Sequence, residues 1–150
     1  MVDWRTMFVR RVLLLLLGGI VTGAGAACET TNPPINPVFS GAVTTESFSG
    51  SLPLLGFKFY SFTAPRAGTI SLTLLSLREG TTASTATIGI GLGVPRGTDC
   101  TLSSTVNTGT GPVPQLTVDI EGSGVLCVRV YDTGTLTAPV DFSVNITRPL

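Results

Sequence analysis

Residues 57–74 read FKFYSFTAPRAGTISLTL, and this stretch decides the class of fold. In residues 70–74, apolar isoleucine and leucine alternate with polar serine and threonine. Residues 57–62 also divide into two alternating sets, Phe57, Phe59 and Ser61 against Lys58, Tyr60 and Phe62. Alternation at every second position is the period of a β-strand. Between them, residues 64–68 (APRAG) place a proline early in a tight turn and a glycine after it. The stretch therefore predicts two strands joined by a tight reversal.

The same period recurs along most of the chain, and no stretch after residue 28 shows the period of a helix. The chain also has 18 glycines and 10 prolines, which suit many turns. About eight short strands, each with one apolar face, are expected to pack as two antiparallel sheets. We predict an all-β fold over residues 43–150, a two-sheet β-sandwich of jelly-roll type, with no prediction of strand order. The further alternating runs are residues 88–92, 116–120, 126–131 and 140–146, and a break at Gly50-Ser51 separates Phe48 from Leu52.

The first 27 residues have the three-part layout of a secretory signal peptide. Arg5, Arg10 and Arg11 form a basic head, residues 12–27 are largely apolar, and the run ends in small residues. A membrane-spanning helix needs about 20 predominantly apolar residues, so this run is short for an anchor. We predict that residues 1–27 are a signal peptide and that the mature protein is exported, either to the cell envelope or as a secreted protein.

Two cleavage sites compete at the end of this signal. Small residues spaced two apart, such as Ala24 and Ala26, suit an ordinary signal peptidase. Residues 25–28 (GAAC) also resemble a bacterial lipobox, in which the cysteine is acylated and becomes the first residue. Gly25 departs from that motif, which usually has leucine there. Acylation of Cys28 would make the protein a lipoprotein whose partner is a membrane.

Residues 28–42 are predicted to be a proline-rich tether between this anchor and the sandwich. Pro33, Pro34 and Pro37 favour an extended chain. In the alternative interpretation, Val38-Phe39 already packs as a first edge strand.

The three cysteines of the chain, Cys28, Cys100 and Cys127, need an explanation because an exported protein favours paired cysteines. Lipidation of Cys28 would leave the other two as a pair. A bridge between them would contribute about 3–4 kcal/mol in the chain-entropy model. We therefore predict a Cys100–Cys127 disulfide. The alternatives are two buried free thiols, or an odd thiol that pairs between chains.

Composition excludes several classes of function. Nine basic and nine acidic residues balance, so no basic patch marks a nucleic-acid partner. The chain has no histidine, which removes histidine-based acid–base catalysis, serine and cysteine nucleophiles activated by histidine, and histidine-ligated zinc. Trp4 is the only tryptophan and lies in the signal, so Tyr60 and Tyr131 are the candidates for a carbohydrate-binding platform.

Residues 89–93 (GIGLG) look superficially like a dinucleotide-binding loop. Such a loop must open a helix, and here Pro95 follows instead, with the glycines at every second position. A strand with only glycine on one face indicates close approach of a neighbouring backbone or side chain.

Four acidic residues form a loose set that could supply calcium ligands: Asp99, Asp119, Glu121 and Asp132. A disulfide would bring the segments of Asp99 and Asp132 together, but no calcium-loop motif is present. Solvated turn residues are the favoured interpretation, so no metal or other cofactor is predicted. No pair of carboxylates stands out for glycoside hydrolysis.

Ser123 lies between two glycines, but outside any nucleophile elbow motif. Without histidine, it would need Lys58, the only lysine, as its base. No catalytic residue is therefore predicted.

Residues 47–74 and 124–147 resemble the opening and closing segments of bacterial pre-peptidase C-terminal domains. The resemblance implies a jelly-roll β-sandwich with an accessory role in secretion, substrate contact or domain packing. This chain departs from the family in its two cysteines and in having no enzyme attached. The matching residues of the opening segment are Gly50, Leu52, Gly56, Tyr60, Phe62, Gly68, Leu72 and Leu74.

The sequence thus predicts a non-enzymatic, exported β-sandwich that serves as a binding or structural module of the bacterial cell envelope. One alternative is a glycan- or protein-binding module, with calcium dependence left open. Another is a small hydrolase that uses carboxylates alone.

Overall fold

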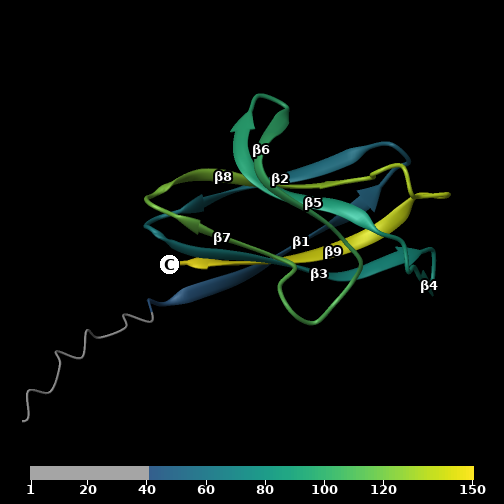
Figure 1. The fold of residues 1–150 in the computed structure, drawn as a ribbon, viewed down its shortest axis with the longest axis horizontal. Helices are drawn as coiled ribbons and strands as arrows, with labels where there is room; N and C mark the ends of the chain where they lie inside the picture. Colours follow the sequence, from purple (N-terminus) through teal and green to yellow (C-terminus); the bar gives the residue numbers. More distant parts are fainter. Residues whose placement is uncertain (1–40) are drawn as a thin grey trace, which may run out of the picture. The chain divides into compact units, whose positions relative to one another are not determined.

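A computed structural model describes residues 41–150, which form a two-layer β-sandwich with no helix (Figure 1). One sheet has five strands, in the order β1–β9–β3, with the short β4 and β7 both pairing with β3. The other has four strands in the order β2–β8–β5–β6. The strands are β1 (Val43–Leu52), β2 (Phe57–Ala64), β3 (Gly68–Glu79), β4 (Thr82–Ala83), β5 (Ile88–Arg96), β6 (Asp99–Thr108), β7 (Leu116–Ile120), β8 (Gly124–Tyr131) and β9 (Val140–Pro149).

The strand pairs are nested in the manner of a jelly roll. β1 pairs with β9, β2 with β8, β3 with β7, and β5 with β6, each antiparallel. The first and last long strands are therefore neighbours, and each inner pair lies within the one before it along the chain. This order confirms the predicted fold class. The ninth strand, beyond the eight expected, is the two-residue β4.

The core lies between the two sheets, where the inward positions of the long strands meet. Period-two alternation places every second side chain on this face. The tight reversal at residues 64–68 is present, and it carries the chain from β2 in one sheet to β3 in the other. The core side chains are Leu52, Phe62, Ile70, Leu72, Leu74, Leu77, Ile88, Ile90, Leu92, Val128, Val130, Leu136, Val140, Phe142, Val144 and Ile146.

The predicted break at Gly50-Ser51 is wrong, because β1 continues through both residues to Leu52. Gly50 pairs with Phe142 of β9. A Cβ atom at Gly50 would lie 3.4 Å from the Phe142 ring, so this glycine gives room to a core aromatic side chain within an unbroken strand.

The outer face of the five-stranded sheet is a lattice of small polar side chains. Thr45 and Thr147 hydroxyls lie 2.8 Å apart across β1 and β9, and the Ser47 hydroxyl donates to the Asn145 side chain over 2.7 Å. Most of this face is therefore kept soluble by uncharged polar groups, with Asp119 of β7 and Asp141 of β9 as charged residues on it. In register, its outward residues include Thr45, Ser47 and Ser49 of β1, Ser143, Asn145 and Thr147 of β9, Ser71 and Thr73 of β3, and Thr117 of β7.

A polar clasp formed by Glu46, Tyr60 and Arg148 joins the two sheets along the side where β1 and β2 meet. The Tyr60 hydroxyl donates to Glu46 over 2.8 Å, and Arg148 Nε donates to the same carboxylate over 2.6 Å. Phe48 stacks on the Tyr60 ring with centroids 5.4 Å apart, and the Phe142 ring meets Phe48 edge-on at 5.2 Å. Tyr60 therefore supports the sandwich and does not form a ligand platform.

The signal peptide, the lipidation site Cys28 and almost all of the tether lie outside the described residues, as does the alternative strand at Val38-Phe39. Among residues 41–150, no helix is long and apolar enough to cross a membrane.

The clasp predicts acid-dependent stability. Hydrogen bonds from Arg148 and Tyr60 hold the pKa of Glu46 below its ordinary value of 4.5. A lowered pKa stabilises the fold above that ordinary value, and the stabilisation is lost as the pH falls through the folded-state pKa. Glu46→Gln should lower the free energy of unfolding by about 2 kcal/mol at pH 7. Urea unfolding at pH 7 and pH 3 measures the effect.

The deficit of Glu46→Gln relative to the parent protein should be smaller at pH 3 than at pH 7, because the stabilisation that comes from the lowered pKa of Glu46 declines as the pH falls below its ordinary value. Asp141→Asn, which removes an exposed carboxylate on β9, is the matched control and should change little at either pH. An equal deficit at both pH values would contradict the proposed role of the Glu46 charge.

Candidate functional site

The outer face of β5 carries three glycines, and each one gives room to a neighbouring group. A Cβ atom at Gly93 would overlap the carbonyl group of Thr101, and one at Gly91 would lie 2.9 Å from the carbonyl oxygen of Ser104. A Cβ atom at Gly89 would overlap the ring of Tyr131. The close approach predicted from the glycine spacing is confirmed.

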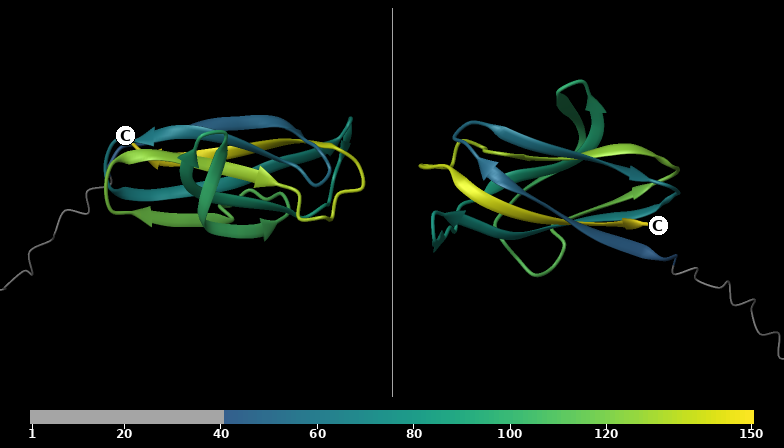
Figure 2. Two further views of the ribbon diagram at one scale, coloured as in Figure 1. Left: turned by 90° about the horizontal axis from the view of Figure 1, so that it is seen from above. Right: turned by 180° about the vertical axis from the view of Figure 1, so that it is seen from behind.

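The hairpin of β5 and β6 bends sharply away from the plane of its sheet. The register between the two strands shifts between Leu92 and Gly93, where β6 carries an extra residue. Bulges of this kind increase the local bend of a strand pair. The end of the hairpin, which we call the arm (residues 93–102), rises out of the sandwich and crosses over the four-stranded sheet (Figures 1 and 2).

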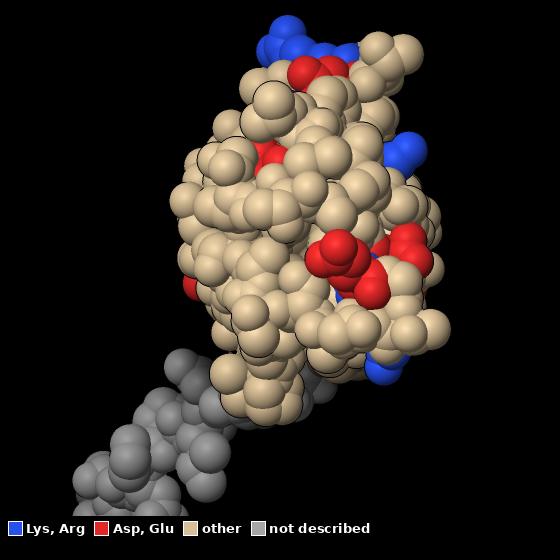
Figure 3. All heavy atoms as spheres, turned by 90° about the vertical axis from the view of Figure 1, so that its right-hand side faces the viewer, with Lys and Arg blue, Asp and Glu red and all other residues tan. Residues whose placement is uncertain are grey.

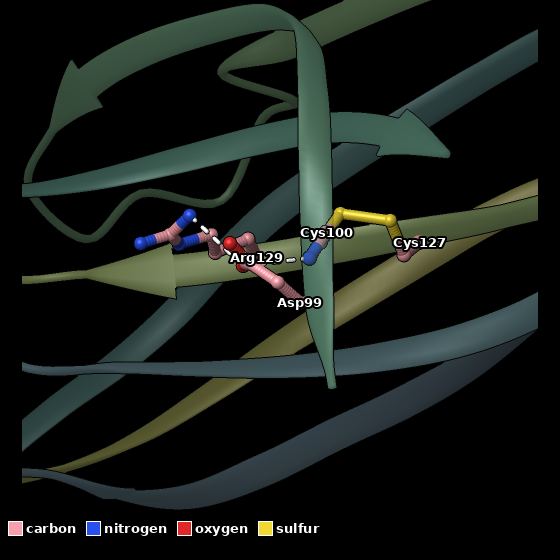
Figure 4. A network of polar contacts seen from close by, with 4 residues as sticks. All are labelled: Asp99, Cys100, Cys127 and Arg129. Carbon is pink, nitrogen blue, oxygen red and sulfur yellow. Dashed lines mark hydrogen bonds and ion pairs between the residues drawn. A yellow bond between two sulfur atoms is a disulfide. The ribbon is translucent and has the colours of Figure 1, made fainter. Parts of the chain in front are cut away.

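The disulfide predicted from the cysteine count is present and fixes the arm to the sheet (Figure 4). Cys100 of β6 and Cys127 of β8 are both fully buried, with Cα atoms 5.9 Å apart. β5 lies between β8 and β6 in the sheet, and Gly93 is the direct neighbour of Cys127. The bridge therefore links two strands that do not pair, at the point where β5 has no side chain.

Arg129, two residues beyond Cys127, is held between the sheet and the arm. Its Nη1 atom lies 3.1 Å from the Asp99 carboxylate, which also accepts the Cys100 backbone N–H over 2.7 Å (Figure 4). The guanidinium group lies 3.9 Å from the centre of the Phe57 ring, a cation–π contact. Arg129 Nε is buried and has no hydrogen-bond partner among the described residues.

These groups form one surface on the outer face of the four-stranded sheet. Register places Phe57, Tyr131 and Gly89 side by side in one row across β2, β8 and β5. Phe59, Arg129 and Gly91 form the next row. We call the set of Phe57, Phe59, Arg129 and Tyr131 the aromatic platform, and Asp99 of the arm lies at its side.

The acidic residues that were considered as calcium ligands do not form one group. Asp99 pairs with Arg129, and the Asp119 carboxylate accepts the Thr69 hydroxyl over 2.6 Å. Glu121 is exposed in the turn after β7. Within residues 41–150, no three acidic or cysteine side chains gather in a group that could hold a metal ion.

Asp132 organises the loops next to the platform. Burial opposes its ionisation, but backbone N–H groups of Leu55, Leu136, Gly134 and Thr135 donate to it and lower its pKa from the ordinary 3.8. Leu55 has a positive φ of 52°, unusual for a residue other than glycine, and its N–H lies 2.8 Å from the carboxylate. The Asp132 carboxylate thus fixes the backbone of two loops.

The carboxylates with shifted pKa values are unsuited to acid catalysis. A general acid in a carboxylate-based hydrolase needs a raised pKa, whereas the pKa values of Glu46 and Asp132 are both lowered. A Ser123–Lys58 pair is also excluded by distance. Ser123 precedes the first residue of β8, whereas Lys58 pairs with Val130 near its far end, about 20 Å along the strand.

Sequence reasoning identified Cys100, Cys127 and Tyr131 but missed Phe57 and Arg129 as site residues. Nothing local marks Arg129, because its partners come from β2 and β6, far away in the chain. The only available signal was the spacing of Arg129, which lies two residues after Cys127 in the same predicted strand. At that spacing both side chains lie on one face of the strand.

No protein-family model matches this chain, and no curated protein is similar to it in sequence. Among solved structures, a chain from Bacillus endospore appendages, described as a family of disulfide-linked pili, is similar in part. The alignment has a TM-score of 0.37 and 12% identity, and covers 73% of this chain and 90% of that one.

The bend of the arm predicts that Gly93 cannot carry a side chain. Gly93→Ala should lower the free energy of unfolding by about 2 kcal/mol or more, because its Cβ atom would overlap the Thr101 backbone. Gly124→Ala, at the start of β8 with open space around it, is the control and should be nearly neutral. Chemical unfolding compares the three proteins, and equal stability of the two variants would contradict this account.

The disulfide predicts a second change in stability. Replacing both Cys100 and Cys127 by alanine should lower the free energy of unfolding by about 3.5 kcal/mol, as expected for a bridge that closes a 27-residue separation. Mass spectrometry of the non-reduced parent protein should find the two cysteine peptides linked. Recovery of both as freely alkylated thiols would contradict the bridge.

Proposed function

We propose that this chain is an exported, non-enzymatic β-sandwich that serves as a binding or structural module of the bacterial cell envelope. The buried Cys100–Cys127 bridge is the observation that carries the proposal. Disulfides form and persist in oxidising compartments outside the cytosol. The bridge also uses two of three cysteines, so that Cys28 is left for another role.

The cysteine that the bridge does not use is the candidate site for a lipid anchor. Cys28 lies at the end of the predicted signal peptide and of the lipobox-like GAAC segment. Acylation there would tether the sandwich to a membrane through residues 28–42. A single acyl chain gives weak, reversible binding, and stable anchoring needs more than one. A lipoprotein cysteine with several acyl chains would meet that requirement.

The arrangement of polar groups supports a binding or structural role over catalysis. The Glu46 and Asp132 carboxylates stabilise the fold through charge-assisted hydrogen bonds, and Asp99 holds Arg129. Charged side chains are few and scattered over the end of the sandwich seen in Figure 3, where uncharged residues cover most of the surface. Such a surface suits contact with an uncharged partner.

A glycan- or protein-binding module is the second candidate, and the aromatic platform favours it. Phe57 is 38% exposed although it is a large aromatic side chain. Exposed aromatic residues beside an arginine are typical of binding surfaces. The resemblance to pre-peptidase C-terminal domains, as accessory modules, agrees with either candidate.

The proposal predicts a lipidated, disulfide-bonded mature protein. The full chain, expressed with its signal in a bacterial host, should fractionate with membranes and show a mass that starts at Cys28 plus acyl groups. Cys28→Ser should lose both the acyl mass and the membrane association. Ala27→Ser, which changes the neighbouring residue and keeps the thiol, is the control and should remain acylated.

Retention of the uncleaved signal in the cytosol, with free Cys100 and Cys127 thiols, would contradict export. A mature protein cleaved before or after Cys28 and released without lipid would contradict only the anchor. Hydrolysis of peptide or glycan substrates by the purified protein at ordinary enzyme rates would contradict the non-enzymatic role.

A further inference from the structure

The aromatic platform has a shape that is unusual for the outside of a sheet. Phe57 and Tyr131 are direct neighbours across β2 and β8, and Gly89 is next in the same row on β5. The Tyr131 ring occupies the space over Gly89 that a side chain would fill. The ring therefore leans over β5 along the surface of the sheet; Tyr131 is half-buried, and the Arg129 guanidinium lies 5.8 Å from the centre of its ring.

Polar groups surround this ring on two sides. Asp99 of the arm is 53% exposed and is bonded to Arg129, whose side chain lies between the arm and the Phe57 ring. On the other side, Asn107 of β6 pairs with Gly89 and is exposed. The row from Phe57 to Asn107 crosses four strands, about 14 Å, which is long enough for several sugar units.

Arg129 is the one charged residue of the platform and is paired with the Asp99 carboxylate beside it, so that the platform and Asp99 together carry no net charge. A binding site for single-stranded nucleic acid also uses stacked aromatic side chains but needs a positive groove along the phosphates. A membrane surface is bound by apolar residues together with a basic cluster. The charge balance of the platform matches neither of these and suits a neutral ligand.

We propose that the aromatic platform binds a neutral glycan, with one sugar ring stacked on Tyr131. A pyranose ring has an apolar face of C–H groups and a rim of hydroxyl groups. An aromatic face bordered by Asp99, Arg129 and Asn107 offers the complementary arrangement of apolar surface, acceptors and donors. This inference deepens the proposed function and rests on it, since it makes the binding module a glycan-binding one.

The arm forms one side of this site and is held rigidly against the sheet. The Cys100–Cys127 bridge and the Asp99–Arg129 pair both attach it to β8, the strand that carries Tyr131. Because the arm is already ordered before a ligand binds, the entropy cost of binding is lower. The disulfide is therefore expected to contribute to affinity as well as to stability.

The test is calorimetric titration of the full mature protein with a set of neutral hexasaccharides. Cellohexaose, xylohexaose, mannohexaose, maltohexaose and chitohexaose are suitable probes. At least one should bind, and Tyr131→Leu should weaken that binding about tenfold or more, since it keeps an apolar side chain and removes the aromatic face. Tyr131→Phe should keep the affinity within about threefold.

Val125→Ala is the matched control, because Val125 is exposed on the same strand and the same face as Tyr131, six residues away. It should leave binding unchanged. Asp99→Asn, an exposed substitution that keeps the side-chain shape, should weaken binding without loss of the fold. Thermal unfolding of every variant separates lost binding from lost structure.

Absence of binding to all five hexasaccharides would overturn the inference, as would binding that Tyr131→Leu leaves unchanged. Binding of oligothymidylate or of phosphatidylglycerol vesicles that Tyr131→Leu abolishes would also overturn it and would assign the platform to that other ligand. None of these results would affect the export and lipidation measured by mass and fractionation, so the two proposals fail separately.

Discussion

The outer face of β5, which has glycine at every second position, is the constraint on which the site depends. Two strands on either side of a third lie about 9.5 Å apart in a sheet. The Cα atoms of Cys100 and Cys127 lie 5.9 Å apart although β5 separates their strands. That distance requires β6 to fold back over β5, and a side chain at Gly93 would block it because its Cβ atom would meet the Thr101 backbone. The glycines on the outer face of β5 therefore allow the disulfide to form, and the disulfide then keeps the bend in place.

The two outer faces of the sandwich differ in the chemistry of their side chains. The five-stranded sheet presents paired hydroxyl and amide side chains, such as Thr45 with Thr147, which contact water well but offer no apolar surface for a ligand. The four-stranded sheet presents Phe57 and Tyr131 beside the arm. The clasp around Glu46 ties the two sheets together at the β1 and β2 side, so the strand that carries Phe57 is fixed from behind. Rigid support of this kind preserves the spacing of a binding surface.

Local sequence predicted the fold class because period-two alternation reports which face of a strand is buried, and it predicted the disulfide because an exported chain pairs its cysteines. It did not predict strand order, since alternation is the same whichever strand lies alongside. The error at Gly50 has the same origin, because its strand continues to supply room for Phe142, a partner far along the chain. Arg129 was missed for this reason too. Its importance depends on Asp99 and Phe57, which only the fold brings to it.

The resemblance to pre-peptidase C-terminal domains rests on positions that any sandwich of this kind must fill. Leu52, Phe62, Leu72 and Leu74 are buried core residues, and Tyr60 belongs to the clasp between the sheets. Such positions carry information about packing and little about ligands, since function resides in sites placed on a fold. None of the platform residues is among the matched positions of the opening segment, although Phe57 and Phe59 lie within it. A comparison restricted to the core would therefore group this protein with other sandwiches and would not take account of the aromatic platform or the arm.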